Sequence, residues 1–165
     1  MAESLKLTEN QRNWLRVQAL IAVLERARDL ELAKYGLTVP QSAVLYCLWE
    51  AKVHNEPMTP MKLSRVLHKQ PHTASALVHR MEAQGLVSTK KDMKRKNWLR
   101  VSLTKKGEEA LKLSASATEV PDLLSCLSKE DTEAMYAVSQ KLYAKSLELL
   151  RKMQSSPFDT QPYLW

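Results

Sequence analysis

Two features of the sequence could do chemistry at a surface: a short polar segment and a run of basic residues after it. Residues 70–80 read QPHTASALVHR and carry imidazole, hydroxyl, amide and guanidinium groups. Such groups form hydrogen bonds with base edges and phosphates. Ten residues further on, five lysines and arginines lie between Lys90 and Lys96. Together these features predict a surface that meets a polyanion.

The charge of the chain is concentrated around these two features. The 165 residues carry a formal net charge of +7, with a pI of about 9.4. Residues 62–106 hold twelve basic side chains and only two acidic ones, Glu82 and Asp92, so this window carries +10 and the remainder −3. A basic middle with mildly acidic flanks favours nucleic acid as a partner. The alternative is a basic surface that is merely solvated.

Residue patterns typical of other chemistry are not found. The sequence contains no nucleophile–base pattern, glycine-rich phosphate loop or paired-carboxylate motif, so neither an enzyme nor a cofactor is predicted. Cys47 and Cys126 lie far apart, which predicts two reduced thiols. His68 and His72 are four residues apart, but Pro71 interrupts the helix between them, so no metal site is expected. With no apolar run of membrane-spanning length and no secretory signal, the expected location is cytoplasmic.

The elements that must position the polar segment are mostly helices. Only three glycines occur, and apolar residues recur with a helical period. Thr8 and Gln11 form a capping-box pattern that opens a first helix, and Gly36 ends it. Thr38 and Pro40 open a second helix.

Two adjacent shorter helices then predict a helix-turn-helix. The first begins at Thr59-Pro60 and runs to about His68; the second begins at Gln70-Pro71 and stops at Gly85. The second helix has an apolar face, expected to point inward, made of Ala74, Leu77, Val78 and Met81.

The pattern after Gly85 changes from a helical to a strand period. Residues 86–90 and 98–103 predict two strands joined by a basic tip, followed by a helix that Thr104 caps. A linker is expected around Val120-Pro121, and a last long helix from Ser128 to about Met153. The predicted fold is mainly α with a small β-hairpin wing, and the functional unit runs from about Thr59 to Thr104.

The second helix of the pair is the predicted recognition helix, because an α-helix fits the major groove, where base edges are distinguishable. Its predicted DNA-binding residues are Gln70, His72, Thr73, Ser75, Ala76, His79 and Arg80. The first turns are expected to reach base edges, and Arg80 a phosphate. The hairpin is expected to follow the DNA backbone or enter the minor groove. Its predicted contacts are Lys90, Lys91, Lys94, Arg95, Lys96 and Asn97.

This arrangement resembles the MarR family of bacterial transcription regulators. The resemblance rests on residues 63–111, LSRVLHKQPHTASALVHRMEAQGLVSTKKDMKRKNWLRVSLTKKGEEAL, and on the long flanking helices. The segment includes the helix start at Pro71, the Gly85-Leu86-Val87 stretch and Leu103-Thr104 followed by Gly107. One departure is in the wing, where Arg95 and Asn97 occupy the places of the family's Asp-x-Arg element.

The resemblance implies a homodimeric regulator that binds an inverted-repeat operator. It implies a dimer built from residues 1–36 and 113–154, a DNA-binding domain at 37–112 and a tail at 155–165. The simplest mode of action is repression, released by a small aromatic ligand that binds between the dimer region and the winged domain. Two alternatives remain: a winged-helix module for protein or nonspecific nucleic acid, and a thiol- or metal-sensing regulator. The implied dimer contacts are Trp14, Ile21, Leu24, Leu142, Leu149 and Met153.

Overall fold

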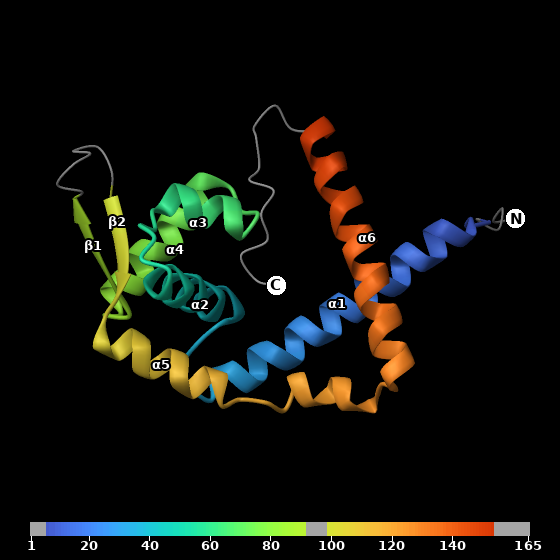
Figure 1. Ribbon diagram of the computed structural model, residues 1–165, viewed down its shortest axis with the longest axis horizontal. Helices are drawn as coiled ribbons and strands as arrows, with labels where there is room; N and C mark the ends of the chain where they lie inside the picture. The colour runs from blue at the N-terminus through green and yellow to red at the C-terminus, as the bar shows by residue number, and fades with distance from the viewer. Residues whose placement is uncertain (1–5, 92–98, 154–165) are drawn as a thin grey trace, which may run out of the picture.

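A computed structural model describes residues 6–91 and 99–153, and it shows a winged helix-turn-helix with two long helices, the first and the last of the chain, on one side of it (Figure 1). The predicted fold class is therefore confirmed. The hairpin tip and the C-terminal tail lie outside the described residues. The elements in chain order are α1 (Glu9–Ala33), α2 (Val39–Val53), α3 (Pro60–Val66), α4 (Pro71–Ala83), β1 (Val87–Lys91), β2 (Leu99–Leu103), α5 (Lys105–Ala115), the 3₁₀ helix η1 (Pro121–Cys126) and α6 (Lys129–Met153).

Side-chain caps fix where the long helices begin. The Thr8 hydroxyl accepts a hydrogen bond from the Gln11 amide at 3.2 Å, and the Gln11 side chain accepts one from Thr8 N at 2.8 Å. Thr38 and Gln41 form a second reciprocal box at the start of α2. Such boxes satisfy amide groups that a helix leaves without partners in its first turn. The capping box predicted at Thr8 is thus confirmed. The predicted start of the second helix at Thr38 is also confirmed, and Thr38 forms a capping box as well.

The winged domain has a single apolar core. Its members come from every element between the end of α1 and β2, so one cluster fixes the helix-turn-helix and the wing together. The wing strands are antiparallel, with Val87 opposite Leu103 and Lys91 opposite Leu99. The fully buried residues of the cluster include Leu32, Leu45, Leu63, Val78, Met81 and Val87.

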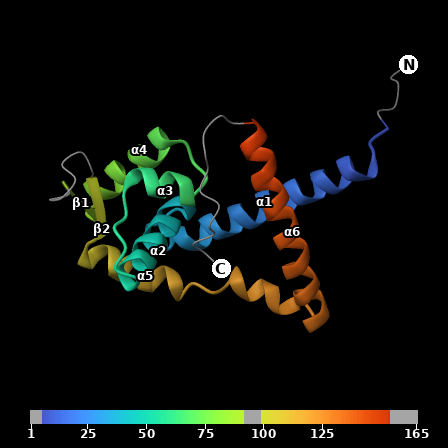
Figure 2. The ribbon, with the colours of Figure 1, turned by 45° about the horizontal axis from the view of Figure 1, so that its top comes forward.

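Most of α1 and α6 lies outside this core. Every residue from 9 to 23 is exposed, and so is every residue from 129 to 142. Figures 1 and 2 show α1 running away from the winged domain and α6 crossing α1, and Tyr143 of α6 lies within hydrogen-bond distance, 3.1 Å, of His68 in the turn between α3 and α4. Within residues 6–91 and 99–153, no helix is both long enough and apolar enough to cross a membrane.

Two helical segments differ from the sequence-based expectation. Residues 121–126 form the 3₁₀ helix η1 where a linker was expected, with Pro121 in its first turn. The α3 helix ends at Val66 rather than near His68. The reason is that His68 adopts a left-handed backbone conformation, with φ of 49°, that a right-handed helix cannot contain.

Candidate nucleic-acid interface

The α4 helix has one buried face and one open face. Ala74, Leu77, Val78 and Met81 are all buried against the core, as their spacing predicted. The opposite face turns toward solvent, and the side chains predicted to contact DNA lie on it. His72, Thr73, Ala76, His79 and Arg80 are exposed, Gln70 just before the helix is exposed, and Ser75 is half-buried.

The C-terminal end of α4 is held by hydrogen bonds from two other helices. The side-chain amide of Gln41, on α2, donates a hydrogen bond from its Nε2 to the side-chain oxygen of Gln84 at 2.6 Å. The Lys106 ammonium of α5 donates to the Gln84 carbonyl at 2.8 Å. A lysine at this point also complements the negative end of the helix dipole. These bonds add to the core packing of α4 by fixing its C-terminal end, and the polar side chains of its first turns face solvent.

Glu82 joins α4 to the wing. Its carboxylate accepts hydrogen bonds from both the amide and the hydroxyl of Thr89 on β1, each at 2.7 Å. These two bonds lower the pKa of Glu82 below its ordinary value, so the carboxylate is charged at neutral pH. This role of Glu82 was not predicted from the sequence, although Glu82 is one of only two acids between residues 62 and 106.

The base of the wing is fixed against α5 and the segment before α3. Thr104 donates a hydrogen bond from its hydroxyl to the Gly85 carbonyl at 2.6 Å and caps α5 by accepting from Gly107 N at 3.0 Å. Val101 N donates to the Met58 carbonyl at 2.9 Å. Both strands of the hairpin thus start from a rigid base.

Only part of the predicted wing surface lies in the described residues. Lys90 and Lys91 are exposed at the outer end of β1, and Arg100 lies opposite Lys90 on β2. Three cationic side chains therefore stand on adjacent positions of the hairpin. The other predicted wing contacts, Lys94, Arg95, Lys96 and Asn97, lie outside the described residues.

A hollow of about 490 Å³ lies between the two helices of the helix-turn-helix and the wing. Lys62 and Arg65 of α3 contribute positive charge to its lining, and Ser75 of α4 contributes a hydroxyl. Leu99 of β2 forms part of the opposite side. The open face of α4 and the wing therefore border one basic concave surface.

These features define the chain as a winged helix-turn-helix protein. No family model matches it. A Bacillus subtilis transcriptional regulator of organic hydroperoxide resistance is 30% identical over 112 residues, which cover 68% of this chain and 71% of the regulator.

Solved structures agree with this similarity. An organohalide-sensing transcriptional regulator bound to 2,4-dichlorophenol has a TM-score of 0.77 at 25% identity, with 87% of this chain and 85% of that one covered. The S. aureus MepR–DNA complex shares the fold, with a TM-score of 0.73 at 20% identity and coverage of 85% and 99%. The chain belongs to the MarR family of transcription regulators. Its function is regulatory rather than enzymatic, as the sequence predicted.

Proposed function

We propose that the protein is a homodimeric, sequence-specific repressor that meets an inverted-repeat operator in the cytoplasm. The observation that carries this proposal is the open polar face of α4 beside a basic wing, fixed to each other through Glu82 and Thr89. A rigid helix with hydrogen-bonding side chains suits direct reading of bases, and the cationic wing suits phosphates.

The exposed apolar surface of α1 and α6 supports the homodimer. Trp14, Ile21, Leu142, Leu149 and Met153 are exposed, and Leu24 is half-buried. Exposed apolar patches of this extent mark interaction sites in water-soluble proteins. On this proposal residues 1–36 and 113–154 form the dimer, and residues 37–112 bind DNA.

Two-fold symmetry then predicts the shape of the operator. Each α4 enters one major groove, and the two half-sites are centred roughly 34 Å apart on one face of the DNA. His72, Thr73, Ser75 and Ala76 are proposed to meet base edges or thymine methyl groups, because they lie in the first turns of α4. Arg80 and the wing lysines are proposed to meet phosphates, which are the same in every sequence.

A cavity of about 370 Å³ supports control by a small ligand. It lies where α1, the start of α2 and the turn between α3 and α4 come together. Val39, Pro40, Ala43 and Leu67 make its apolar lining, Lys69 adds an ammonium group, and Glu25 and Asp29 add carboxylates on the α1 side. We propose that a small aromatic ligand with a hydrogen-bond acceptor for Lys69 binds here. Because Leu67 and Lys69 flank the turn before α4, such a ligand would contact the segment that positions the recognition helix.

Selection of bound duplexes from a random pool tests the DNA-binding proposal. We expect a preferred palindrome with two half-sites, and an affinity that falls steeply as salt rises, because bound phosphates release counterions. If random duplex competes as well as the selected sequence, specific regulation is wrong.

Single substitutions separate the two kinds of contact. Lys91→Ala is expected to weaken binding to all sequences and to reduce the salt slope by about one. His72→Ala and Ser75→Ala are expected to change which sequence is preferred, with a cost of about 1–3 kcal/mol at the affected base pair. An unchanged preference in both variants would contradict the proposed base contacts.

A further inference from the structure

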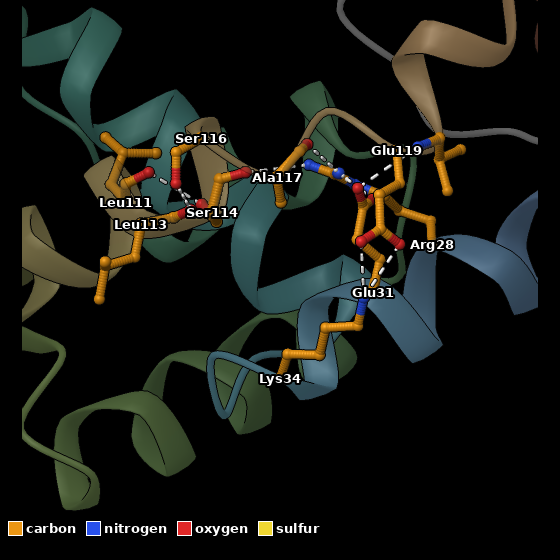
Figure 3. Close-up of polar contacts among 10 residues, drawn as sticks. Arg28, Glu31, Lys34, Leu111, Leu113, Ser114, Ser116, Ala117 and Glu119 are labelled. Carbon is orange, nitrogen blue, oxygen red and sulfur yellow. Dashed lines mark hydrogen bonds and ion pairs between the residues drawn. The ribbon is translucent and has the colours of Figure 1, made fainter.

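Two segments of the chain connect the winged domain to the helices proposed to form the dimer. One is the end of α1 leading into α2, and the other is the end of α5 leading into η1. Figure 3 shows that these segments lie side by side and that polar side chains of α1 reach across to the second segment. We call this junction, residues 28–34 together with 114–120, the neck.

Arg28 makes the central contacts of the neck. Its Nη1 donates to the Ala117 carbonyl at 2.8 Å, and its Nη2 donates to the Ser114 carbonyl at 3.3 Å. The same Nη1 forms an ion pair with Glu31, one turn further along α1. Ser114 belongs to the last turn of α5, where carbonyls lack the regular helical partner, and its carbonyl also accepts a hydrogen bond from Ala117 N at 3.3 Å, just past the helix end. Arg28 therefore caps α5 from a different helix.

Glu31 closes the neck from the other side. Its side chain is only 3% exposed, and its second carboxylate oxygen accepts a hydrogen bond from Val120 N at 3.3 Å. Lys34 adds an ion pair with Glu119 at 2.8 Å, but both of these side chains are exposed. The neck thus has an inner pair, in which the half-buried Arg28 meets the buried Glu31, and a solvent-facing pair, Lys34 with Glu119.

The chemistry of the inner pair requires an arginine. A guanidinium group presents several N–H donors in a rigid plane, so it can bond two carbonyls and a carboxylate at once. A lysine ammonium keeps the charge but is a compact point on a flexible stem, so it cannot hold the same three acceptors in fixed geometry. The exposed Lys34–Glu119 pair is screened by water and salt and restricts movement less.

We infer that Arg28 is a positioning residue, which ties α1 to the end of α5 and so sets the separation of the two recognition helices. The inference rests on the proposed homodimer and operator. With two connections to the dimer helices tied together, the winged domain cannot swing about either one alone. The separation of the recognition helices is then fixed, and the protein selects one spacing between operator half-sites.

Operators with altered spacing test this inference on the full-length protein. Adding or removing one base pair between half-sites moves one of them by about 3.4 Å and rotates it by about 35° around the DNA axis. Wild-type affinity is expected to fall about tenfold or more for each such step, because the DNA must twist to restore the fit. Arg28→Lys is expected to reduce this penalty to about threefold or less, since a freer winged domain adjusts at little cost.

Matched variants and two further measurements distinguish positioning from general damage. Circular dichroism reports folding and sedimentation reports the dimer, and both are expected to be unchanged in Arg28→Lys. Glu31→Gln is expected to flatten the spacing profile in the same direction, and it provides the test if Arg28→Lys does not fold. Lys34→Ala removes the exposed pair and is expected to keep the wild-type profile.

The possible outcomes separate this inference from the proposed function. A folded, dimeric Arg28→Lys variant with the wild-type spacing profile overturns the role of Arg28, and so does an equal flattening by Lys34→Ala. A wild-type protein that binds a palindrome but tolerates any spacing overturns the inference and leaves the proposed function intact. A wild-type protein with no preferred palindrome overturns the proposed function itself.

Discussion

Cys47 shows how the surroundings of one residue bear on the choice between mechanisms. Its side chain is 2% exposed, and burial raises the pKa of its thiol to about 11, from an ordinary value of 9.0. The thiolate is the form that reacts with oxidants, so Cys47 is poorly placed to act as a peroxide sensor. The family relative from Bacillus subtilis is named for organic hydroperoxide resistance. At Cys47, the structure favours a small buried side chain over a thiol sensor.

The reactivity of Cys47 can be measured in a variant that has no other thiol. Cys126→Ser leaves Cys47 as the single cysteine in the sequence. Because the raised pKa makes the thiolate scarce, we expect Cys47 in the folded protein to react with a disulfide reagent about a hundredfold more slowly than in the unfolded chain. The comparison uses the same variant in buffer and in denaturant near pH 8. Similar rates in the two conditions would restore the thiol-sensing alternative.

Glu31 links the stability of the neck to pH. Burial favours the neutral carboxyl, but hydrogen bonds from Arg28 and Val120 and the charge of Arg28 outweigh it and lower the pKa below 4.5. A lowered folded-state pKa contributes stability above the unfolded value, and this contribution is lost as pH falls through the folded value. The charged form of Glu31 therefore stabilises the folded protein at neutral pH.

Chemical denaturation from pH 7 down to pH 3 tests this linkage. We expect Glu31→Gln to lower the free energy of unfolding at pH 7 by about 1–3 kcal/mol, because a charged hydrogen bond is lost in a buried site. The difference from wild type should shrink as pH falls from 4.5 toward the lower folded-state pKa, because the unfolded chain takes up a proton at Glu31 before the folded protein does. Glu148→Gln, which removes an exposed ion pair with Lys145, is the control and should cost under about 1 kcal/mol. A pH-independent effect of Glu31→Gln would show that its charge is unimportant.

At the scale of elements, α5 and the start of β1 meet at a glycine. A Cβ atom on Gly107 would lie 2.0 Å from the Leu86 carbonyl oxygen, which belongs to the backbone and cannot rotate away. In most helices alanine is more stable than glycine by about 1 kcal/mol. Here the close approach of the two backbones reverses that order.

Gly107→Ala is therefore expected to destabilise the protein by about 1–3 kcal/mol, the usual cost of overfilling a packed site. Thermal or denaturant unfolding measures the change, and DNA binding should weaken with it because the wing base must shift. The control is Lys105→Ala in the same first turn, an exposed position where the effect should stay within about 0.5 kcal/mol. If Gly107→Ala left the free energy of unfolding unchanged or raised it, the backbone at Leu86 would be able to shift at little energetic cost, contrary to this prediction.

The elements were predictable where their cause is local. The caps at Thr8 and Thr104 and the apolar period of α4 are patterns within a few residues, so the sequence predicted them. The neck was not predictable, because Arg28 and the carbonyls it binds are 86 and 89 residues apart. Every residue has a backbone carbonyl, so the sequence does not reveal which carbonyls Arg28 binds. The need for glycine at position 107 was also not predictable, because Leu86 becomes a neighbour of Gly107 only when the chain folds.

At the scale of the whole molecule, a single chain offers α1 little tertiary packing. Residues 9–23 are exposed on every side, although they include Trp14, Val17, Leu20 and Ile21. An isolated helix in water has little stability of its own, and most helices depend on tertiary packing. The proposed second copy would supply that packing for α1 and α6. It would also bring two recognition helices onto one DNA molecule.

A charge placed on the apolar face of α1 tests this dependence. Ile21→Glu would bury an unpaired carboxylate in the proposed dimer interface, which costs several kcal/mol, whereas residue 21 is exposed in a single protomer. We expect sedimentation to show a monomer at micromolar concentration. Affinity for the palindrome should fall about a hundredfold or more, because the second half-site no longer binds as part of the same complex.

The matched control carries the same glutamate on the other side of the helix. Ala19 is exposed and lies two residues from Ile21, so it points in nearly the opposite direction around α1. Ala19→Glu should therefore remain a dimer with nearly wild-type affinity. Circular dichroism of Ile21→Glu should retain the signal of the winged domain, whose core contains no residue before Leu32. A dimeric Ile21→Glu protein would move the interface away from this face of α1, and tight palindrome binding by a proven monomer would separate DNA recognition from dimerisation.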